Sequence, residues 1–240
     1  MANLSGDKRA AYVQEMFTRI AFRYDLMNRI MTAGQDVYWR RWVIEKTELP
    51  KNGKLLDLGA GTGDLAREAL HQHPESFSLA SDFTLEMMRV GKAREQDQPG
   101  TLSWAAADAT RLPFPDQTFD AVVSGFLLRN VTDLPGSLRE QFRVLKPGGR
   151  IVSLDTTPPP NNLLTPFMKF HLHTVIPALG KLITGQAEAY HYLPDSTESF
   201  LQPEQLVSRM LGAGFKQVKY QRLMFGAIAI HWARKPDPKE

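Results

Sequence analysis

This 240-residue chain has no cysteine, no long apolar run and no strong excess of charge. The absence of cysteine excludes disulfide bonds, thiolate metal sites and a cysteine nucleophile. Because no stretch of about 18 apolar residues is present, no transmembrane helix is expected. The polar start, Met1–Arg9, lacks the apolar segment of a signal peptide. These absences favour a soluble cytoplasmic protein.

The net charge of +3 is small for this length, and the basic residues are scattered along the chain. A nucleic-acid partner is therefore not expected. The histidines and acidic residues also lack the spacing of metal ligands, so no metal site is expected. Hydrophobic residues make up 42% of the chain, which is ample for the core of one α/β domain.

The most informative segment runs from Asp57 to Asp64 and reads D-L-G-A-G-T-G-D. A buried strand is predicted before it and a helix after it, and glycines between such elements let a ligand approach the backbone closely. The spacing differs from the G-x-G-x-x-G of dinucleotide sites, and the carboxylate of Asp64 would repel a pyrophosphate. The turn favours a cationic ligand and resembles the first motif of S-adenosylmethionine (SAM)-dependent methyltransferases. A nucleotide site or a purely structural turn is the alternative.

Strand and helix patterns alternate from Lys54 onward, which implies right-handed crossovers and a parallel sheet covered on both faces. Pro147-Gly148-Gly149 predicts a turn before the fifth strand, and two late strands joined at Gly226 can pair only as an antiparallel hairpin. The predicted strands are residues 54–58, 77–81, 102–106, 119–124, 150–154, 217–225 and 227–233.

These patterns predict an α/β fold of the Rossmann-like, class I methyltransferase type, with a mostly parallel seven-stranded sheet and an antiparallel last strand. Within this single domain we expect four segments: a helical lid at 1–50, a SAM-binding core at 51–155, a helical substrate cap at 156–201, and a C-terminal helix and β-hairpin at 202–240. Pro177 is expected to divide the apolar helical stretch of the cap. The alternative is that the cap helices only complete the core.

Ligands of open α/β sheets bind beyond the carboxyl ends of the strands. Asp82, at the second strand end, is predicted to accept hydrogen bonds from both ribose hydroxyls, with Phe83 packing on a purine. Asp108 and Ala109, at the third, are predicted to contact the adenine amino group, and Gly125, at the fourth, the methionine moiety. Each acid alone could instead cap a helix. The predicted cofactor contacts of the glycine-rich turn are Asp57, Gly59, Ala60, Gly61 and Thr62.

Several segments resemble the ubiquinone/menaquinone biosynthesis methyltransferases, the UbiE family, and the likeness covers about residues 10–234. These segments are Y-D-L-M-N at 24–28, F-L-L-R-N-V-T-D at 126–133, R-V-L-K-P-G-G at 143–149 and Y-H-Y-L-P-D-S at 190–196.

This chain departs from the family pattern at two notable positions. The family usually has a histidine where Asp36 stands and a glycine where Leu127 stands, and we expect both residues near the acceptor. A helix cap is a second explanation for Asp36.

The resemblance implies that the ring carbon of a prenylated hydroquinone, such as demethylmenaquinol or a ubiquinone precursor, is methylated with SAM as the cofactor. The expected partner is therefore a small aromatic or quinone acceptor. Because of the departures, two alternatives stay open: methylation of a soluble natural product, or a SAM-binding relative that catalyses a reaction without methyl transfer, such as a pericyclic one.

A ring carbon becomes nucleophilic when a base removes a phenol proton and the phenolate is stabilised. Arg129 is predicted to stabilise that charge and Asn130 to orient the hydroxyl or a water, as the resemblance also implies. The alternative is a structural Arg129 paired with Asp133 or Asp155.

The base is not fixed by the sequence. His171, His173 and His191 are possible bases, and His171 is the one placed among the predicted catalytic residues, although a lone histidine is more often structural. Tyr24, Tyr190 and Tyr192 are expected to line the acceptor pocket or to donate a hydrogen bond to the acceptor oxygen.

An isoprenoid tail requires an apolar channel, which the N-terminal helices and residues 163–183 could form. The same surfaces could rest on the inner face of a membrane, so peripheral membrane contact is an expectation. Assembly into a homo-oligomer is left open.

Overall fold

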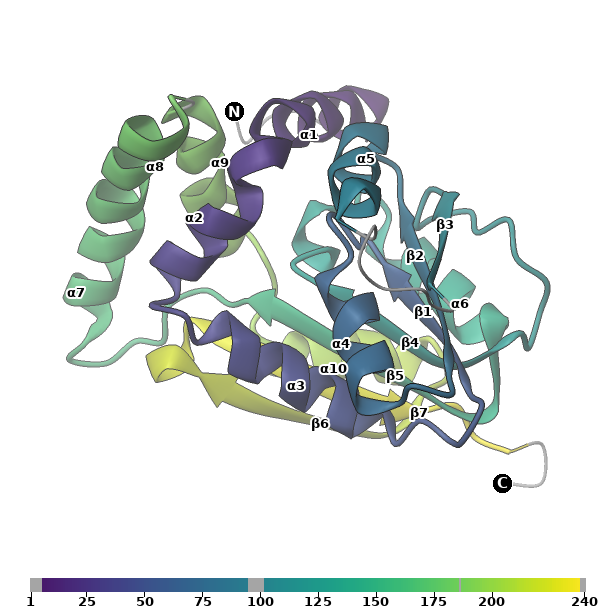
Figure 1. Ribbon diagram of the computed structural model, residues 1–240. Helices are drawn as coiled ribbons and strands as arrows, with labels where there is room; N and C mark the ends of the chain where they lie inside the picture. The colour runs from purple at the N-terminus through teal and green to yellow at the C-terminus, as the bar shows by residue number, and fades with distance from the viewer. Residues whose placement is uncertain (1–5, 95–101, 186, 238–240) are drawn as a thin grey trace.

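A seven-stranded sheet forms the centre of the computed structural model, which describes residues 6–94, 102–185 and 187–237 (Figure 1). The strand order is β3-β2-β1-β4-β5-β7-β6. The strands are β1 (Lys54–Leu58), β2 (Phe77–Asp82), β3 (Leu102–Ala106), β4 (Phe119–Gly125), β5 (Leu145–Thr156), β6 (Lys216–Leu223) and β7 (Ile228–Arg234).

The first five strands pair in parallel, whereas β7 runs antiparallel to both β5 and β6. The predicted mostly parallel sheet with a closing hairpin is therefore confirmed. The turn predicted at Pro147-Gly148-Gly149 is wrong, because β5 already begins at Leu145 and contains these residues. Between the pair Phe119 and Leu145 and the pair Ala121 and Arg150, β5 contains more residues than β4, so the register of the two strands shifts there. Gly148 lies in this bulged part of β5 and has φ +75°.

Helices cover both faces of the sheet. One face carries α3 (Asp36–Thr47), α4 (Asp64–Gln72) and α5 (Leu85–Ala93), and the other carries α6 (Leu134–Val144) and α10 (Pro203–Gly212) (Figure 1). The buried strand residues alternate between the two layers: Leu55 packs in the cluster of Trp39, and Leu56 in that of Leu138. This alternation fixes the strands between the layers and leaves their carboxyl ends for a ligand.

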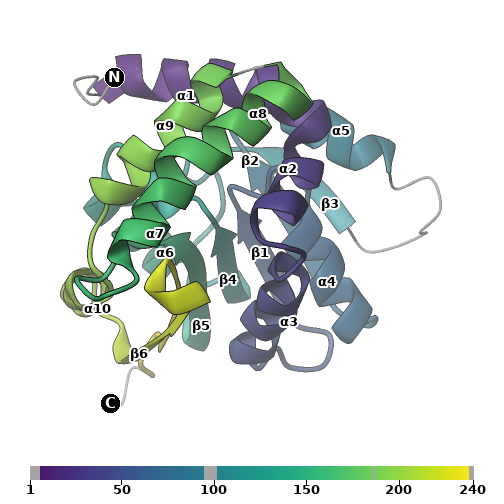
Figure 2. The ribbon, with the colours of Figure 1, turned by 90° about the vertical axis from the view of Figure 1, so that its left-hand side faces the viewer.

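The remaining helices lie together over the carboxyl edge of the sheet (Figure 2). A third apolar cluster joins all of them except the helix Thr165–Phe170, with Met27, Ile176 and Tyr190 among its buried members. These helices are α1 (Gly6–Ile20), α2 (Tyr24–Met31), α7 (Thr165–Phe170), α8 (Ile176–Thr184) and α9 (Ala187–Glu198). Residues 1–5 and 238–240 of the predicted segments lie outside the described residues. Although α3 falls within the segment 1–50 that was expected to form a lid, it covers one face of the sheet.

A π-helical segment, His171–Val175, connects α7 to α8 directly before Pro177. Proline lacks the N–H that an α-helix needs at this point, so the helical run continues with a locally wider turn. Among the described residues, no helix is both long and apolar enough to cross a membrane.

Candidate active site

The glycine-rich turn between β1 and α4 has its glycines in left-handed conformations. The φ angles are +67° at Gly59, +57° at Gly61 and +84° at Gly63. A Cβ atom at Gly59 would lie 2.7 Å from Cδ1 of Leu127. Glycine is therefore required both by the backbone conformation and by the close packing above it.

Asp57 lies at the base of this turn with a side chain that is fully buried. Its Oδ2 accepts a hydrogen bond from the N–H of Ala66 at 3.0 Å, whereas Oδ1 has no partner among the described residues. Burial raises the pKa of this carboxyl to about 7. A buried oxygen without a donor is costly, and a ligand ammonium would satisfy it.

Asp82 ends β2 beside the same turn, and both of its oxygens are held by the backbone. Oδ2 accepts the N–H of Gly61 at 2.8 Å and Oδ1 accepts that of Thr84 at 2.7 Å. Burial raises its pKa above the ordinary aspartate value. Each oxygen keeps a lone pair for a ligand hydroxyl, which suits the predicted ribose contact.

Two small pockets border the turn, each of about 50 Å³, and they share Tyr24, Gly59, Gly61, Gly125 and Phe126. The first, which we call the turn pocket, is also lined by Asp25, Asn28, Arg40, Asp57, Ala60, Thr62, Asp64, Leu65 and Leu154. The second, which we call the Asp82 pocket, is also lined by Asp82, Phe83, Thr84, Met87, Val13, Phe17, Leu127 and Asn130.

Every predicted cofactor residue except Asp108 and Ala109 lines one of these pockets. The exposed Asp108 side chain accepts the N–H and the hydroxyl of Thr110, at 2.7 and 2.8 Å. Ala109 is buried in the hydrophobic core. The contact of these two residues with adenine therefore stays a prediction.

A much larger cavity of about 380 Å³ lies on the cap side of the site and shares Asn28 and Phe126 with the turn pocket. Most of its wall is apolar and comes from the cap helices and from the turn before β7. Its apolar lining includes Met31, Leu164, Phe167, Met168, Leu172, Ile176, Leu193, Met224, Phe225 and Ile228.

His171 is one of the polar residues on the wall of the large cavity. Its Nε2 is buried and has no hydrogen-bond partner among the described residues. His173, in contrast, points to Glu198 with its Nε2 3.0 Å from Oε1, and the His191 side chain lies outside the described residues. Of the predicted bases, the structure thus brings His171 to the cavity.

Arg129 also lines the large cavity, and it is buried. Its Nη1 lies 2.5 Å from Oδ1 of Asp155, and its guanidinium carbon lies 5.2 Å from the centroid of the Phe126 ring. Its Nε has no hydrogen-bond partner within the described part of the chain. The buried ion pair with Asp155, which was expected if Arg129 has a structural role, is therefore present. The paired guanidinium nevertheless lines the large cavity.

Other predicted catalytic residues have structural contacts. Asn130 donates from Nδ2 to the carbonyl of Phe126 at 3.0 Å and accepts from the hydroxyl of Tyr192 at 3.1 Å. Tyr190 is buried against Gly180 and lines none of these three cavities, and burial raises its pKa to about 12. Tyr24 lines both small pockets rather than the large cavity, and burial raises its pKa.

Neither family departure is among the residues that line the large cavity. Leu127 packs on Gly59 and lines the Asp82 pocket, and Asp36 is buried at the start of α3. Thr32, which lines the large cavity, donates from its hydroxyl to Asp36 at 3.1 Å. The expectation that both residues lie near the acceptor stays a prediction. The N-cap of α3 is Gln35, so the cap explanation for Asp36 is wrong.

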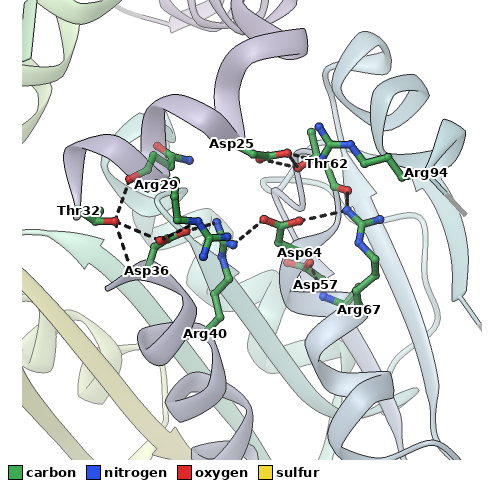
Figure 3. A network of polar contacts seen from close by, with 12 residues as sticks. Asp25, Arg29, Thr32, Asp36, Arg40, Asp57, Thr62, Asp64, Arg67 and Arg94 are labelled. Carbon is green, nitrogen blue, oxygen red and sulfur yellow. Dashed lines mark hydrogen bonds and ion pairs between the residues drawn. The ribbon is translucent and has the colours of Figure 1, made fainter. Parts of the chain in front are cut away.

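A network of ion pairs joins α3 to the glycine-rich turn (Figure 3). Arg40 pairs with Asp36 at 3.0 Å and with Asp64 at 2.6 Å, and Arg67 pairs with Asp64 at 3.1 Å. Asp64, expected from the sequence to be a free negative charge that attracts a cationic ligand, is instead paired with two arginines, which the sequence did not predict. The spacing of four residues between Asp36 and Arg40 on one helix was the available signal.

The sheet order, the orphaned Asp57 oxygen and the glycine cradle that a Cβ would fill together define a class I SAM-dependent methyltransferase. The profile of the "ubiE/COQ5 methyltransferase family" matches residues 4–235. This protein belongs to that family.

Among its relatives, the "Ubiquinone/menaquinone biosynthesis C-methyltransferase UbiE" of Desulfotalea psychrophila is 47% identical over 223 residues, which are 93% of this chain and 90% of that protein. The "Demethylmenaquinone methyltransferase" of Thermus thermophilus is 40% identical over 221 residues, covering 92% of this chain and 100% of that protein.

Solved structures of low sequence identity share the fold. The [4+2]-cyclase SpnF superposes with a TM-score of 0.67 at 17% identity, covering 94% of this chain and 95% of that chain. The phosphoethanolamine N-methyltransferase 2 of Haemonchus contortus, solved with SAM, gives 0.64 at 16% identity, covering 83% of this chain and 53% of that chain.

Proposed function

We propose that this protein transfers the methyl group of SAM to a ring carbon of a prenylated hydroquinone. The observation that carries the proposal is the apolar cavity of about 380 Å³ that shares Phe126 and Asn28 with the turn pocket. A cavity of this size and character suits an aromatic ring with an apolar tail. The names of the relatives, which refer to ubiquinone, menaquinone and demethylmenaquinone, support the same acceptor class.

The bound SAM supplies an electrophilic methyl group, and Asp57, Asp82 and the glycine-rich turn would hold it. The protein must then align the ring carbon with that group. Holding both reactants in line lowers the barrier by up to about 7–11 kcal/mol in the best intramolecular cases. The shared wall at Phe126 is the place where the two ligands would meet.

His171 is the proposed general base. Its unpartnered Nε2 would take the proton of an acceptor hydroxyl, leaving the phenolate electron pair to conjugate into the ring and make the carbon nucleophilic. Arg129 would stabilise the negative charge that develops on the oxygen. In the Arg129–Asp155 pair the guanidinium is fixed in orientation, so it need not reorganise during the reaction.

The rim of the large cavity is the proposed contact with a membrane. Leu164, Phe167 and Phe225 line the cavity, yet they are 44, 73 and 76% exposed. Lys169 and Lys181 lie on the same helical run and would attract anionic headgroups. A tail that resides in a bilayer could pass into the cavity at this rim without crossing water.

A labelled-methyl transfer assay tests the proposal. Reduced demethylmenaquinone with a short prenyl tail should be methylated on carbon, whereas phenols without a tail should react at least about tenfold more slowly. Equal rates on soluble phenols would contradict the proposed acceptor class. No transfer to any hydroquinone, with SAM bound, would contradict it as well.

A further inference from the structure

We propose that Arg40 binds the α-carboxylate at the methionine end of SAM and that Asp36 is the positioning residue that holds Arg40 in place. The inference deepens the cofactor part of the proposed function and does not depend on the acceptor. It rests on the charged residues that line the turn pocket and on the network of ion pairs drawn in Figure 3.

Arg40 is the only basic residue among the described residues that line the turn pocket. Its side chain is only 14% exposed, although Arg40 belongs to α3, one of the helices that cover a face of the sheet. Arg41, the next residue, is 53% exposed and reaches Glu68 at 4.0 Å instead. The two neighbouring arginines thus have distinct environments, and only Arg40 faces the pocket.

The other charged groups of the turn pocket are carboxylates, namely Asp25, Asp57 and Asp64. An amino-acid end of a ligand brings an ammonium and a carboxylate together. The ammonium suits the acids, and the unpartnered Oδ1 of Asp57 can accept from it. The ligand carboxylate would be repelled by the same acids unless a cation lies between them, and Arg40 is that cation.

The guanidinium of Arg40 has donors to spare. It carries five N–H groups, and its two ion pairs engage Nη2 with Asp36 at 3.0 Å and Nη1 with Asp64 at 2.6 Å. The remaining N–H groups can bind a carboxylate in the fork geometry that arginine prefers. The contact with Asp64 also fixes Arg40 at the end of the turn where the ligand lies.

Asp36 is suited to position Arg40 because it is itself immobilised. Its side chain is 1% exposed, accepts a hydrogen bond from the hydroxyl of Thr32 at 3.1 Å, and lies 3.5 Å from Nε of Arg29. Thr32 lines the large cavity, so this carboxylate connects the acceptor side to the cofactor side. A neutral histidine at position 36 could not form the ion pair that holds Arg40.

Titration calorimetry with three ligands separates carboxylate binding from general damage to the pocket. The ligands are SAM, decarboxylated SAM, which keeps the sulfonium and amine, and 5′-methylthioadenosine, which lacks the amino-acid end. Arg40→Gln should weaken SAM about ten- to a hundredfold, while decarboxylated SAM changes less than about threefold. Arg41→Ala is the matched control and should leave the affinity for all three ligands unchanged.

Three results would overturn the proposal: wild-type protein that binds decarboxylated SAM as tightly as SAM, an Arg40→Gln variant that loses both ligands equally, or one that loses neither. If Arg40→Gln does not fold, Arg40→Lys keeps the charge without the fork and should retain only part of the preference for SAM. Retained affinity for 5′-methylthioadenosine shows that the pocket is intact.

The positioning role of Asp36 has its own readout. Asp36→Asn and Asp36→His should reduce the ratio of SAM to decarboxylated SAM affinity several-fold, with the affinity for 5′-methylthioadenosine retained. Asp36→Glu should restore part of the ratio. An unchanged ratio in Asp36→Asn would refute the positioning role. Because these are binding measurements without acceptor, a failed hydroquinone assay would leave them valid, and their failure would leave that assay valid.

Discussion

The guanidinium of Arg129 and the carboxylate of Asp155 form an ion pair inside the protein, with 2.5 Å between Nη1 and Oδ1 and with only 7 and 3% of the two side chains exposed. Removing one partner of such a pair leaves an uncompensated buried charge. Arg129→Met should therefore lower the free energy of unfolding by about 3–5 kcal/mol, and the double variant Arg129→Met/Asp155→Leu should recover much of the loss. Urea denaturation measures both, and a double variant as unstable as the single one would show that the pair is not the cause.

The raised pKa of Asp57 predicts how SAM binding depends on pH. The carboxyl titrates at about 7 instead of near 3.8, so in the free protein it is largely protonated at pH 6 and ionised at pH 8. Because the ligand ammonium binds the ionised form, SAM affinity should rise by several-fold between these pH values. Calorimetry at a series of pH values should give this slope for wild type but not for Asp57→Asn. 5′-Methylthioadenosine, without the ammonium, is the control and should show little slope.

The same shift predicts the pH dependence of stability. The folded state binds the Asp57 proton more tightly than the unfolded state, so this group's contribution to stability falls as pH rises from about 4 to about 7. Asp57→Asn should remove that component. Thermal unfolding of the ligand-free protein across this range, compared with the variant, measures the difference, and identical slopes for the two proteins would argue against it.

The contact between Gly59 and Leu127 predicts a non-additive pair of substitutions. Gly59→Ala forces φ +67° on an alanine and places its Cβ 2.7 Å from Cδ1 of Leu127, which should cost about 2–4 kcal/mol. Leu127→Gly removes the overlapping atoms, so the double variant should be more stable than the sum of the two single effects by about 1 kcal/mol. Chemical denaturation of all four proteins gives the coupling, and simple additivity would exclude the steric explanation.

The proposed base can be tested without disturbing the cofactor. His171→Gln keeps polarity at the large cavity but removes the basic nitrogen, so kcat for the hydroquinone should fall by about 10²-fold or more. His171 lines neither small pocket, and SAM affinity should stay as in wild type. His173→Gln is the matched control because that ring pairs with Glu198 outside the cavity. Equal loss in both variants would remove the assignment.

The apolar rim predicts a dependence on tail length. Phe167→Ser and Phe225→Ser each remove apolar surface from the exposed rim of the large cavity. Because this rim is the proposed membrane contact, KM should rise for long-tailed acceptors in vesicles. The KM for a tail-free or short-tailed analogue in detergent should change little. A parallel rise for both acceptors would indicate damage to the cavity rather than loss of membrane contact. Leu211→Ser, a similarly exposed residue on α10, serves as the control.

Much of the fold could be predicted because strand and helix periodicities are local. Residues 54–58 and 102–106 match β1 and β3 in full, and the late hairpin was expected from the single short connection at Gly226. The residues around 147–149 do not reveal by themselves that this segment is a bulge inside β5 and not a turn before it. Which of the two forms depends on how the segment pairs with the neighbouring strand β4.

The cofactor site was more predictable than the acceptor site. The predicted cofactor residues cluster at strand ends, which one topological rule brings together, and eight of the ten line the two small pockets. Asp108 follows the same rule but turns its carboxylate to Thr110. Two of the predicted acceptor residues, His171 and Tyr190, come from a cap whose packing no local rule describes, and Tyr190 is buried against Gly180 instead of lining the large cavity.

The sequence by itself determined the local features of this protein: glycines where φ is positive, acidic residues at strand ends, and the regular spacing of apolar residues along each helix. These depend on residues close together in the chain. Only the tertiary structure decided which charges are compensated, since Arg40 meets Asp64 and Arg129 meets Asp155 across 24 and 26 positions of sequence. Electrostatic energy depends on distance in space and on burial, and neither is written in the order of the residues.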